Sequence, residues 1–275
     1  MSNLRITKLD QSSVHYTKGN THYSISGSKG TYLVFIHGVG LNKEIWKPQV
    51  DYFSPTYRVV TYDFLGHGLS PSPRPNPTID DYVEQLNELI NSLNISTFSL
   101  IGHSMGAIIS IAYSLKYEDK INSLIPLNIV YKRSNDARDQ VLDRANKILQ
   151  TREIGNIEQT MSRWFENIRE PDQTEKINKV RQLLLSASPK GYGHAYKLFA
   201  MSDSIFENLL DNLNVPVLYL TGSDDPNSNS KMSHEMAKKS PKGFSKIIDN
   251  EAHMMAYIAP AKVNPIIKDF LQQNE

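Results

Sequence analysis

The chain has 275 residues, and its 30 lysines and arginines nearly balance its 29 aspartates and glutamates, which leaves a formal net charge of +1. This balance gives no reason to expect a nucleic-acid partner, which would require a concentrated basic face, and 39% hydrophobic with 21% charged residues is an ordinary globular composition. The absence of cysteine excludes a disulfide framework, thiolate metal sites and a cysteine nucleophile.

The N-terminal residues 1–8 are polar and lack the apolar core of a signal peptide. No run approaches the ~18 apolar residues that a transmembrane helix needs. We therefore expect a cytoplasmic protein with no membrane partner. No P-loop, dinucleotide-binding glycine pattern or metal-ligand spacing is visible, so we expect no cofactor and no metal. The sequence carries no signal of the oligomeric state.

Short apolar runs rich in β-branched and aromatic residues alternate with helix-like stretches along most of the chain. We expect strands at Tyr32–His37, Tyr57–Asp63, Phe98–Gly102, Ser123–Asn128, Val215–Thr221 and Phe244–Ile248. We expect helices at Ile79–Leu93, Ala107–Tyr117, Ser230–Lys239 and Ala261–Gln272. This alternation predicts an α/β fold with a mostly parallel central sheet flanked by helices.

The segment 133–212 breaks this alternation, because it is rich in charge and helix formers and contains no convincing strand. The strand pattern resumes at Val215, and the sheet would be incomplete without that strand. We therefore expect a core domain formed by 1–132 and 213–275, with 133–212 inserted between sheet strands as a helical cap. An independent helical domain is the alternative.

A G-x-S-x-G pentapeptide at Gly102–Gly106 is the strongest chemical signal in the chain. It follows the expected strand Phe98–Gly102 and precedes the expected helix Ala107–Tyr117, which is the context of a sharp strand-to-helix turn. Such a turn strains the serine backbone, and glycines on either side relieve the crowding. We predict Ser104 as a nucleophile that projects above the carboxyl edge of the sheet. A glycine-rich turn with an incidental serine is the alternative.

A serine hydroxyl needs a base at neutral pH, and His253 is the histidine that follows the last expected strand. In this type of site the chain order is serine, acid, histidine, which places the acid in the loop after Val215–Thr221. Asp224 and Asp225 are adjacent there, and the G-x-x-D spacing favours Asp225 as the group that holds one imidazole tautomer. Asp224 stays open as the alternative acid.

The loop that begins at His37 is expected to supply half of an oxyanion hole. A carbonyl oxygen that becomes an oxyanion needs two N–H donors already directed at it. We assign these donors to the backbone amides of Val39 and Met105. The His37 imidazole is expected to tie loops together beneath the site.

Five segments, in this order and spacing, resemble the α/β-hydrolase superfamily over nearly the whole chain. They are His37–Gln49, Tyr62–Ser70, Ile101–Ala107, Leu220–Pro226 and Asn250–Met255. Within this superfamily, Ser162–Phe165, Gly191, Tyr192 and Ala195 resemble the 3-oxoadipate enol-lactonases and related small carboxylesterases. The resemblance implies the α/β-hydrolase fold and, for the subfamily, a small anionic lactone as substrate.

The expected cap should decide substrate choice. Side chains there that would line an apolar pocket are Trp164, Phe165, Tyr192, Tyr196 and Phe199, and Arg163 or Lys197 would pair with a substrate carboxylate. For each of them, packing of the cap onto the core, or simple solvation of the cation, is the alternative.

Together these residues predict a serine hydrolase that cleaves a small carboxylic ester or lactone by two-step acyl transfer. Ser104 attacks the carbonyl, His253 takes its proton, and water then hydrolyses the acyl-enzyme. A C–C bond hydrolase of the meta-cleavage type would use the same triad, and thioester hydrolysis also stays open. A non-catalytic ligand receptor with this fold is a further alternative, because fold alone does not establish activity.

Overall fold

The computed structural model describes residues 15–165, 173–202 and 205–274. Within these ranges eight strands form one sheet in the order β1-β2-β4-β3-β5-β6-β7-β8. Strand β2 runs antiparallel to both of its neighbours, and all other neighbouring pairs are parallel. The strands are β1 (His15–Tyr16), β2 (His22–Ser26), β3 (Tyr32–Ile36), β4 (Arg58–Tyr62), β5 (Phe98–His103), β6 (Ile121–Leu127), β7 (Val217–Gly222) and β8 (Gly243–Ile248).

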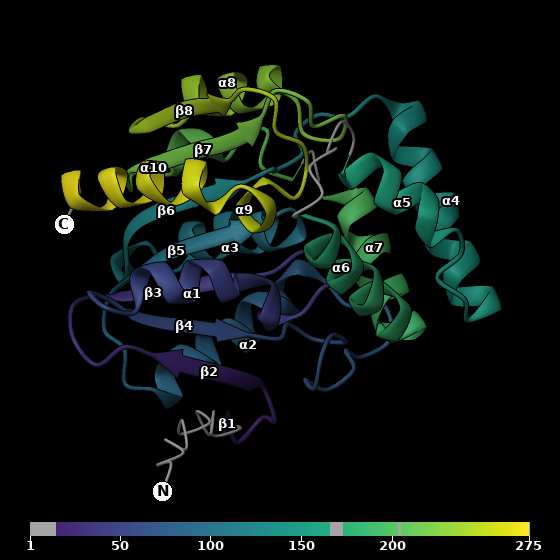
Figure 1. The fold of residues 1–275 in the computed structure, drawn as a ribbon, viewed down its shortest axis with the longest axis horizontal. Helices are drawn as coiled ribbons and strands as arrows, with labels where there is room; N and C mark the ends of the chain where they lie inside the picture. The colour runs from purple at the N-terminus through teal and green to yellow at the C-terminus, as the bar shows by residue number, and fades with distance from the viewer. Residues whose placement is uncertain (1–14, 166–172, 203–204, 275) are drawn as a thin grey trace, which may run out of the picture.

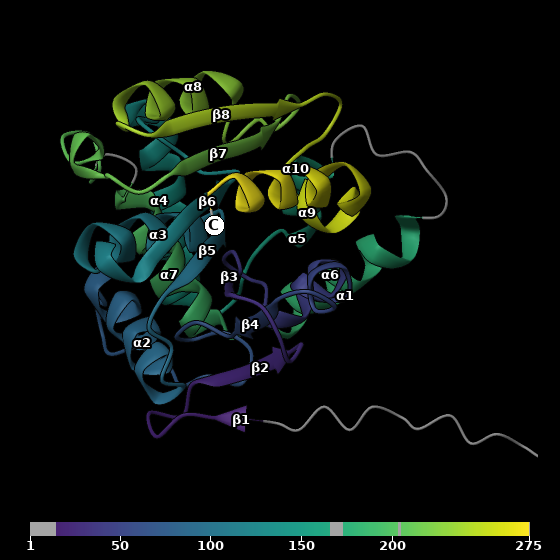
Figure 2. The same cartoon turned by 90° about the vertical axis from the view of Figure 1, so that its left-hand side faces the viewer.

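The central strands are buried on both faces, which explains their continuous apolar sequences. In β3, Leu33, Val34, Phe35 and Ile36 have no exposed surface. Because successive side chains of a strand point to opposite faces, burial of all four requires a helical layer on each side of the sheet. Figure 2 shows these layers, with α1 and α10 on one face and α2, α3 and α8 on the other.

The helices that cover the sheet are short to medium in length. They are α1 (Lys47–Phe53), α2 (Ile79–Ser92), α3 (Met105–Lys116), α8 (Ser230–Lys239), α9 (Met255–Ile258) and α10 (Pro260–Gln273). The described residues also contain the 3₁₀ turns η1 (Lys43–Trp46), η2 (Glu118–Lys120) and η4 (Leu210–Asn212). None of the helices in the described ranges is both long and apolar enough to cross a membrane.

Within the described ranges, four further helices follow β6 and precede β7. They are α4 (Asn135–Thr151), α5 (Ile157–Trp164), α6 (Thr174–Ser186) and α7 (Pro189–Met201). Figure 1 shows them gathered beyond the ends to which the parallel strands point. These helices lie inside the segment 133–212 that the sequence sets apart, and they stand over the edge of the sheet where ligands of open α/β sheets bind.

The predicted fold class is confirmed, since the sheet is mostly parallel and carries helices on both faces. Each expected strand is present with its ends moved by two residues or fewer. The helix that follows Ser104 begins at Met105 instead of Ala107. Residues 166–172 and 203–204 of the expected cap lie outside the described residues.

Candidate active site

Ser104 lies in the turn between β5 and α3 with a strained backbone. Its φ of 55° and ψ of −115° lie outside the helical and extended regions, and the residue is only 8% exposed. A non-glycine residue held in such a conformation costs of order 1–3 kcal/mol and persists where the surroundings enforce it. The turn therefore presents the hydroxyl at the carboxyl end of β5 and at the N-terminus of α3, as the motif predicts.

The two glycines of the motif are required because backbone atoms pack directly against them. A Cβ at Gly102 would lie 2.2 Å from the carbonyl oxygen of Gly106, and a Cβ at Gly106 would lie 2.3 Å from that of Ile36. Neither distance leaves room for a methyl group. The close approach of β3, β5 and α3 thus depends on both glycines and fixes the direction in which Ser104 points.

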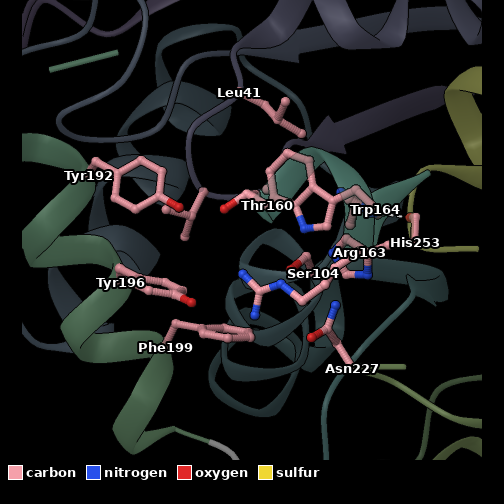
Figure 3. Close-up of a pocket in the computed structure, with 13 residues that line it drawn as sticks. Leu41, Ser104, Thr160, Arg163, Trp164, Tyr192, Tyr196, Phe199, Asn227 and His253 are labelled. Carbon is pink, nitrogen blue, oxygen red and sulfur yellow. Dashed lines mark hydrogen bonds between the residues drawn. The ribbon is translucent and has the colours of Figure 1, made fainter. Parts of the chain in front are cut away.

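His253 and Asp225 lie in two different loops, after β8 and after β7, and a buried hydrogen bond joins their side chains. Nδ1 of His253 and Oδ2 of Asp225 are 2.7 Å apart, and the two residues are 3% and 2% exposed. This bond fixes the imidazole with its Nδ1 on the carboxylate, so Nε2 is left for another partner. His253 and Ser104 line the same cavity (Figure 3).

Asp225, and not Asp224, is the acid that meets the histidine. The Asp225 carboxylate also accepts hydrogen bonds from the Asn128 side chain at 2.8 Å and from the backbone amide of Asn227 at 2.8 Å. Burial acts to raise its pKa, but His253 and the hydrogen bonds from the Ser228 hydroxyl and the Asn227 amide outweigh burial and hold the pKa well below its ordinary value. Asp225 is therefore an anion at neutral pH, whereas the half-buried Asp224 carboxylate accepts a hydrogen bond from its neighbour Ser223.

Two backbone amides beside Ser104 have no acceptor. Among the hydrogen bonds of the described residues, none is donated by the amide of Val39, and Met105 is the first residue of α3, where an amide has no intrahelical partner. Val39 lines the cavity, and a Cβ at the adjacent Gly38 would lie 3.3 Å from Cβ of Ser104. Of the two amides that the sequence predicts as oxyanion donors, one therefore belongs to the residue that follows Ser104 and the other to a residue that lines the same cavity.

Two buried histidines support these loops. His103 Nε2 donates to the carbonyl oxygen of His253 at 2.9 Å, and burial lowers the pKa of His103 to about 3, so its ring is neutral. His37 accepts from the backbone amide of Phe64 at 3.2 Å and stacks on the Phe64 ring. The expected supporting role of His37 thus has a structural basis, and His103 holds the backbone of the catalytic candidate His253 in the same way.

The cavity at Ser104 is small, with a volume of about 40 Å³, and side chains of α5 and α7 form much of its wall. It holds about three water molecules, at 10–15 Å³ for each. Its lining comprises Gly38, Val39, Leu41, His103, Ser104, Thr160, Arg163, Trp164, Tyr192, Tyr196, Phe199, Asn227 and His253. Figure 3 shows Tyr192, Tyr196 and Phe199 projecting from α7 on the side opposite Trp164 and His253.

Phe165, which we expected in the pocket, does not line this cavity and belongs to the buried hydrophobic core. Helical spacing explains the difference. On α5, Thr160, Arg163 and Trp164 share the face that looks into the cavity. Met161 and Phe165, four residues apart, share the opposite, buried face. Lys197, the other cation considered for a substrate carboxylate, is also absent from the lining, whereas Phe199 is present.

Arg163 is the only residue with a permanent charge that lines the cavity within the described ranges. Its Nε is buried and, among the residues that the structure describes, has no hydrogen-bond partner. A buried donor without an acceptor lowers the stability of the fold by about 1–3 kcal/mol. A bound ligand that supplies the acceptor would explain why an arginine occupies this position. No carboxylate of the described residues lines this cavity.

Thr160, Asn227 and Leu41 line the cavity but were not among the residues expected from the sequence. The period of α5 would have indicated Thr160, which precedes Arg163 by three residues and Trp164 by four. Asn227 follows Asp225 in the same loop, and its position depends on how that loop turns. No sequence signal distinguishes it from an ordinary loop residue.

The fold and the site together define a hydrolase of the α/β type. The α/β-hydrolase fold family matches residues 31–260, and the chain belongs to this family. A curated relative, (E)-2-((N-methylformamido)methylene)succinate hydrolase of Acinetobacter baylyi, is 37% identical over 91% of this chain and 94% of its own length. A second relative, 3-oxoadipate enol-lactonase 2 of the same organism, is 27% identical over 70% of this chain and 71% of its own length.

Solved structures agree with this assignment. A thermophilic esterase from Thermogutta terrifontis superimposes with a TM-score of 0.82 at 26% identity, covering 94% of this chain and 96% of the esterase. The enol-lactonase from Burkholderia xenovorans gives the same TM-score at 20% identity, covering 94% of this chain and 100% of that enzyme. The second comparison shows the shared fold only.

Proposed function

We propose that this chain is a serine hydrolase that cleaves a small, carboxylate-bearing ester or lactone through an acyl-enzyme on Ser104. The observation that carries the proposal is the strained Ser104, which lines one cavity with Val39 and with His253 of the His253–Asp225 pair. Among the described residues, the amides of Val39 and Met105 have no acceptor. These groups match the three needs of acyl transfer, which are a nucleophile, a base in a fixed tautomer and donors for the oxyanion.

In the proposed reaction, Nε2 of His253 takes the proton of Ser104 while Oγ attacks the substrate carbonyl. The amides of Val39 and Met105 stabilise the oxyanion, and the Asp225 carboxylate stabilises the imidazolium. Collapse of the tetrahedral intermediate breaks the bond to the leaving alkoxide or enolate, and the imidazolium returns the proton where the leaving group needs it. Water activated by His253 then attacks the acyl carbon and regenerates Ser104.

We propose Arg163 as the group that binds a carboxylate of the substrate, with Trp164, Tyr192 and Tyr196 enclosing the remainder. The unpartnered Nε of Arg163 and the absence of a protein carboxylate from the cavity lining, within the described residues, support this assignment. The segment 133–212 would then act as the cap that closes over the substrate. A cytoplasmic location belongs to the same proposal.

Hydrolysis of an N-acyl compound is a second candidate, favoured by the relative at 37% identity. That protein is named as a hydrolase of an N-methylformamido-methylene succinate, whose name combines an N-acyl group with two carboxylates. The same Ser104 chemistry would cleave such a bond, with His253 protonating the nitrogen that leaves.

Pre-steady-state hydrolysis of p-nitrophenyl acetate by the wild type and Ser104→Ala tests the proposal. We expect a burst of nitrophenolate, roughly one per active chain, that is lost in the variant. A panel of lactones, hemiesters of dicarboxylic acids and N-acyl enamines then separates the two candidates. Equal turnover by wild type and variant would refute the role of Ser104. Absence of turnover, with binding of panel compounds retained, would favour the receptor alternative.

A further inference from the structure

A second cavity adjoins the one at Ser104 and shares part of its wall. It has a volume of about 290 Å³ and is lined by residues of α4, α7, the start of α5 and the loop between α4 and α5. Thr160, Tyr192 and Tyr196 line both cavities. These three side chains therefore form a partition, with the nucleophile on one side and a larger space on the other.

Basic side chains of α4 face this second cavity. Arg144 and Lys147 line it, and Glu153 is the only carboxylate that does so among the described residues. Nε of Arg144 donates to the carbonyl oxygen of Gln140 at 3.3 Å, and neither cation forms an ion pair within the part of the chain that the structure describes. The cavity therefore carries an excess of positive charge with hydrogen-bond donors left over.

The tyrosine pair of the partition stands between two arginines. The Arg144 guanidinium lies 5.8 Å from the ring centroid of Tyr196, whose ring is 5.4 Å from that of Tyr192. Burial and Tyr196 raise the pKa of Tyr192, whereas Arg163 and Arg144 both lower it, so both guanidinium groups act on the same hydroxyl. A cation thus lies on each side of the partition.

The two tyrosines differ in how tightly their side chains are packed. Tyr192 is 4% exposed and packs so closely on the loop after β3 that a Cβ at Gly40 would lie 2.6 Å from its ring. Tyr196 is only partly buried, and its ring stacks on Phe199 at 5.9 Å. Tyr196 is therefore the less tightly packed of the two tyrosines, and its rotation would connect the two cavities.

We propose that the second cavity is a distal subsite of the same substrate site, in which Arg144 and Lys147 bind a carboxylate at the far end of the substrate. This inference rests on the proposed function and narrows its substrate class to small acyl compounds with two carboxylates. One carboxylate pairs with Arg163 near the scissile bond, and the other crosses the partition beside Tyr196. The space at Ser104, about 40 Å³, is too small for both ends of such a compound, whereas the adjoining 290 Å³ accommodates the second.

Binding to the Ser104→Ala protein tests the subsite without depending on turnover. Calorimetric titration with adipate and with hexanoate compares two chains of equal length that differ in one carboxylate. We expect adipate to bind about tenfold more tightly, as one charge-assisted contact provides. Arg144→Met in the same background should remove this preference, and Tyr196→Ala, which opens the partition, should increase it.

Arg138→Met is the matched control, because Arg138 lies on the same helix, pairs with Asp139 at 3.4 Å and does not line the cavity. It should keep the tenfold preference, and thermal melting should confirm that each variant is folded. Equal affinity for adipate and hexanoate, or a preference that survives Arg144→Met, would overturn the subsite. Either result would leave hydrolysis by the wild type intact, so failure of the subsite is distinguishable from failure of the proposed function.

Discussion

Replacement of Arg163 by methionine should weaken the processing of anionic substrates while it stabilises the free protein. Methionine keeps much of the length of the arginine side chain but removes the guanidinium, whose Nε is buried without a partner. Because an unsatisfied buried donor costs about 1–3 kcal/mol, its removal should raise the free energy of unfolding by about 1 kcal/mol. In a chain of this size that corresponds to about 2 °C in Tm.

The effect on activity has the opposite sign and depends on substrate charge. A hydrogen bond to an ionised group contributes about 1.5–3 kcal/mol, so kcat/KM for a carboxylate-bearing ester should fall roughly 10- to 100-fold relative to its neutral methyl ester. The assay measures both esters for the wild type, Arg163→Met and the control Lys197→Met, whose side chain lies outside the cavity lining. Equal losses for the charged and neutral esters, or a Tm lowered by several degrees, would refute this reasoning.

Three further substitutions test the machinery around Ser104. Asp225→Asn should lower kcat by about 10⁴-fold, the loss known for this change in a serine protease triad, while Asp224→Asn stays near wild type in the same ester assay. Since the native pKa of Asp225 is depressed, its stabilising effect is present above the unfolded carboxyl pKa of about 4 and declines below it. The difference in urea-unfolding free energy between wild type and Asp225→Asn should therefore shrink as the pH is lowered through that value, and a constant difference would contradict the assigned pKa direction. Gly106→Ala should cost about 3 kcal/mol or more in urea unfolding, because its Cβ would lie 2.3 Å from the Ile36 carbonyl oxygen, and a near-neutral result would contradict that packing.

The sheet was predictable because burial on both faces leaves a local trace in the sequence. A strand such as β3 has to be apolar at every position when helices cover both faces, so it is visible without tertiary information. The turn at Ser104 was predictable for a similar reason, since backbone contacts at Gly102 and Gly106 exclude any side chain. In both cases the residues that the structure requires, apolar side chains in the strand and glycines in the turn, lie within one short segment of the sequence.

The pocket was less predictable because its lining depends on which face of a helix looks inward. Trp164 and Phe165 are adjacent aromatic residues, yet one lines the cavity and the other packs into the core. Asn227 enters the lining through the turn of the loop that positions Asp225. Contacts between segments that are distant in the chain determine which side chains line the cavity, and residue type alone does not predict it.

The most direct test of the central claim is to find the residue that reacts. The wild type, incubated with a fluorophosphonate and digested, should yield one modified peptide with the adduct on Ser104, and intact-protein mass spectrometry should give one label per chain. His253→Ala should slow the labelling by orders of magnitude, since the serine then lacks its base. Labelling at another residue, or labelling of Ser104→Ala at the wild-type rate, would contradict the assignment of Ser104 as the nucleophile.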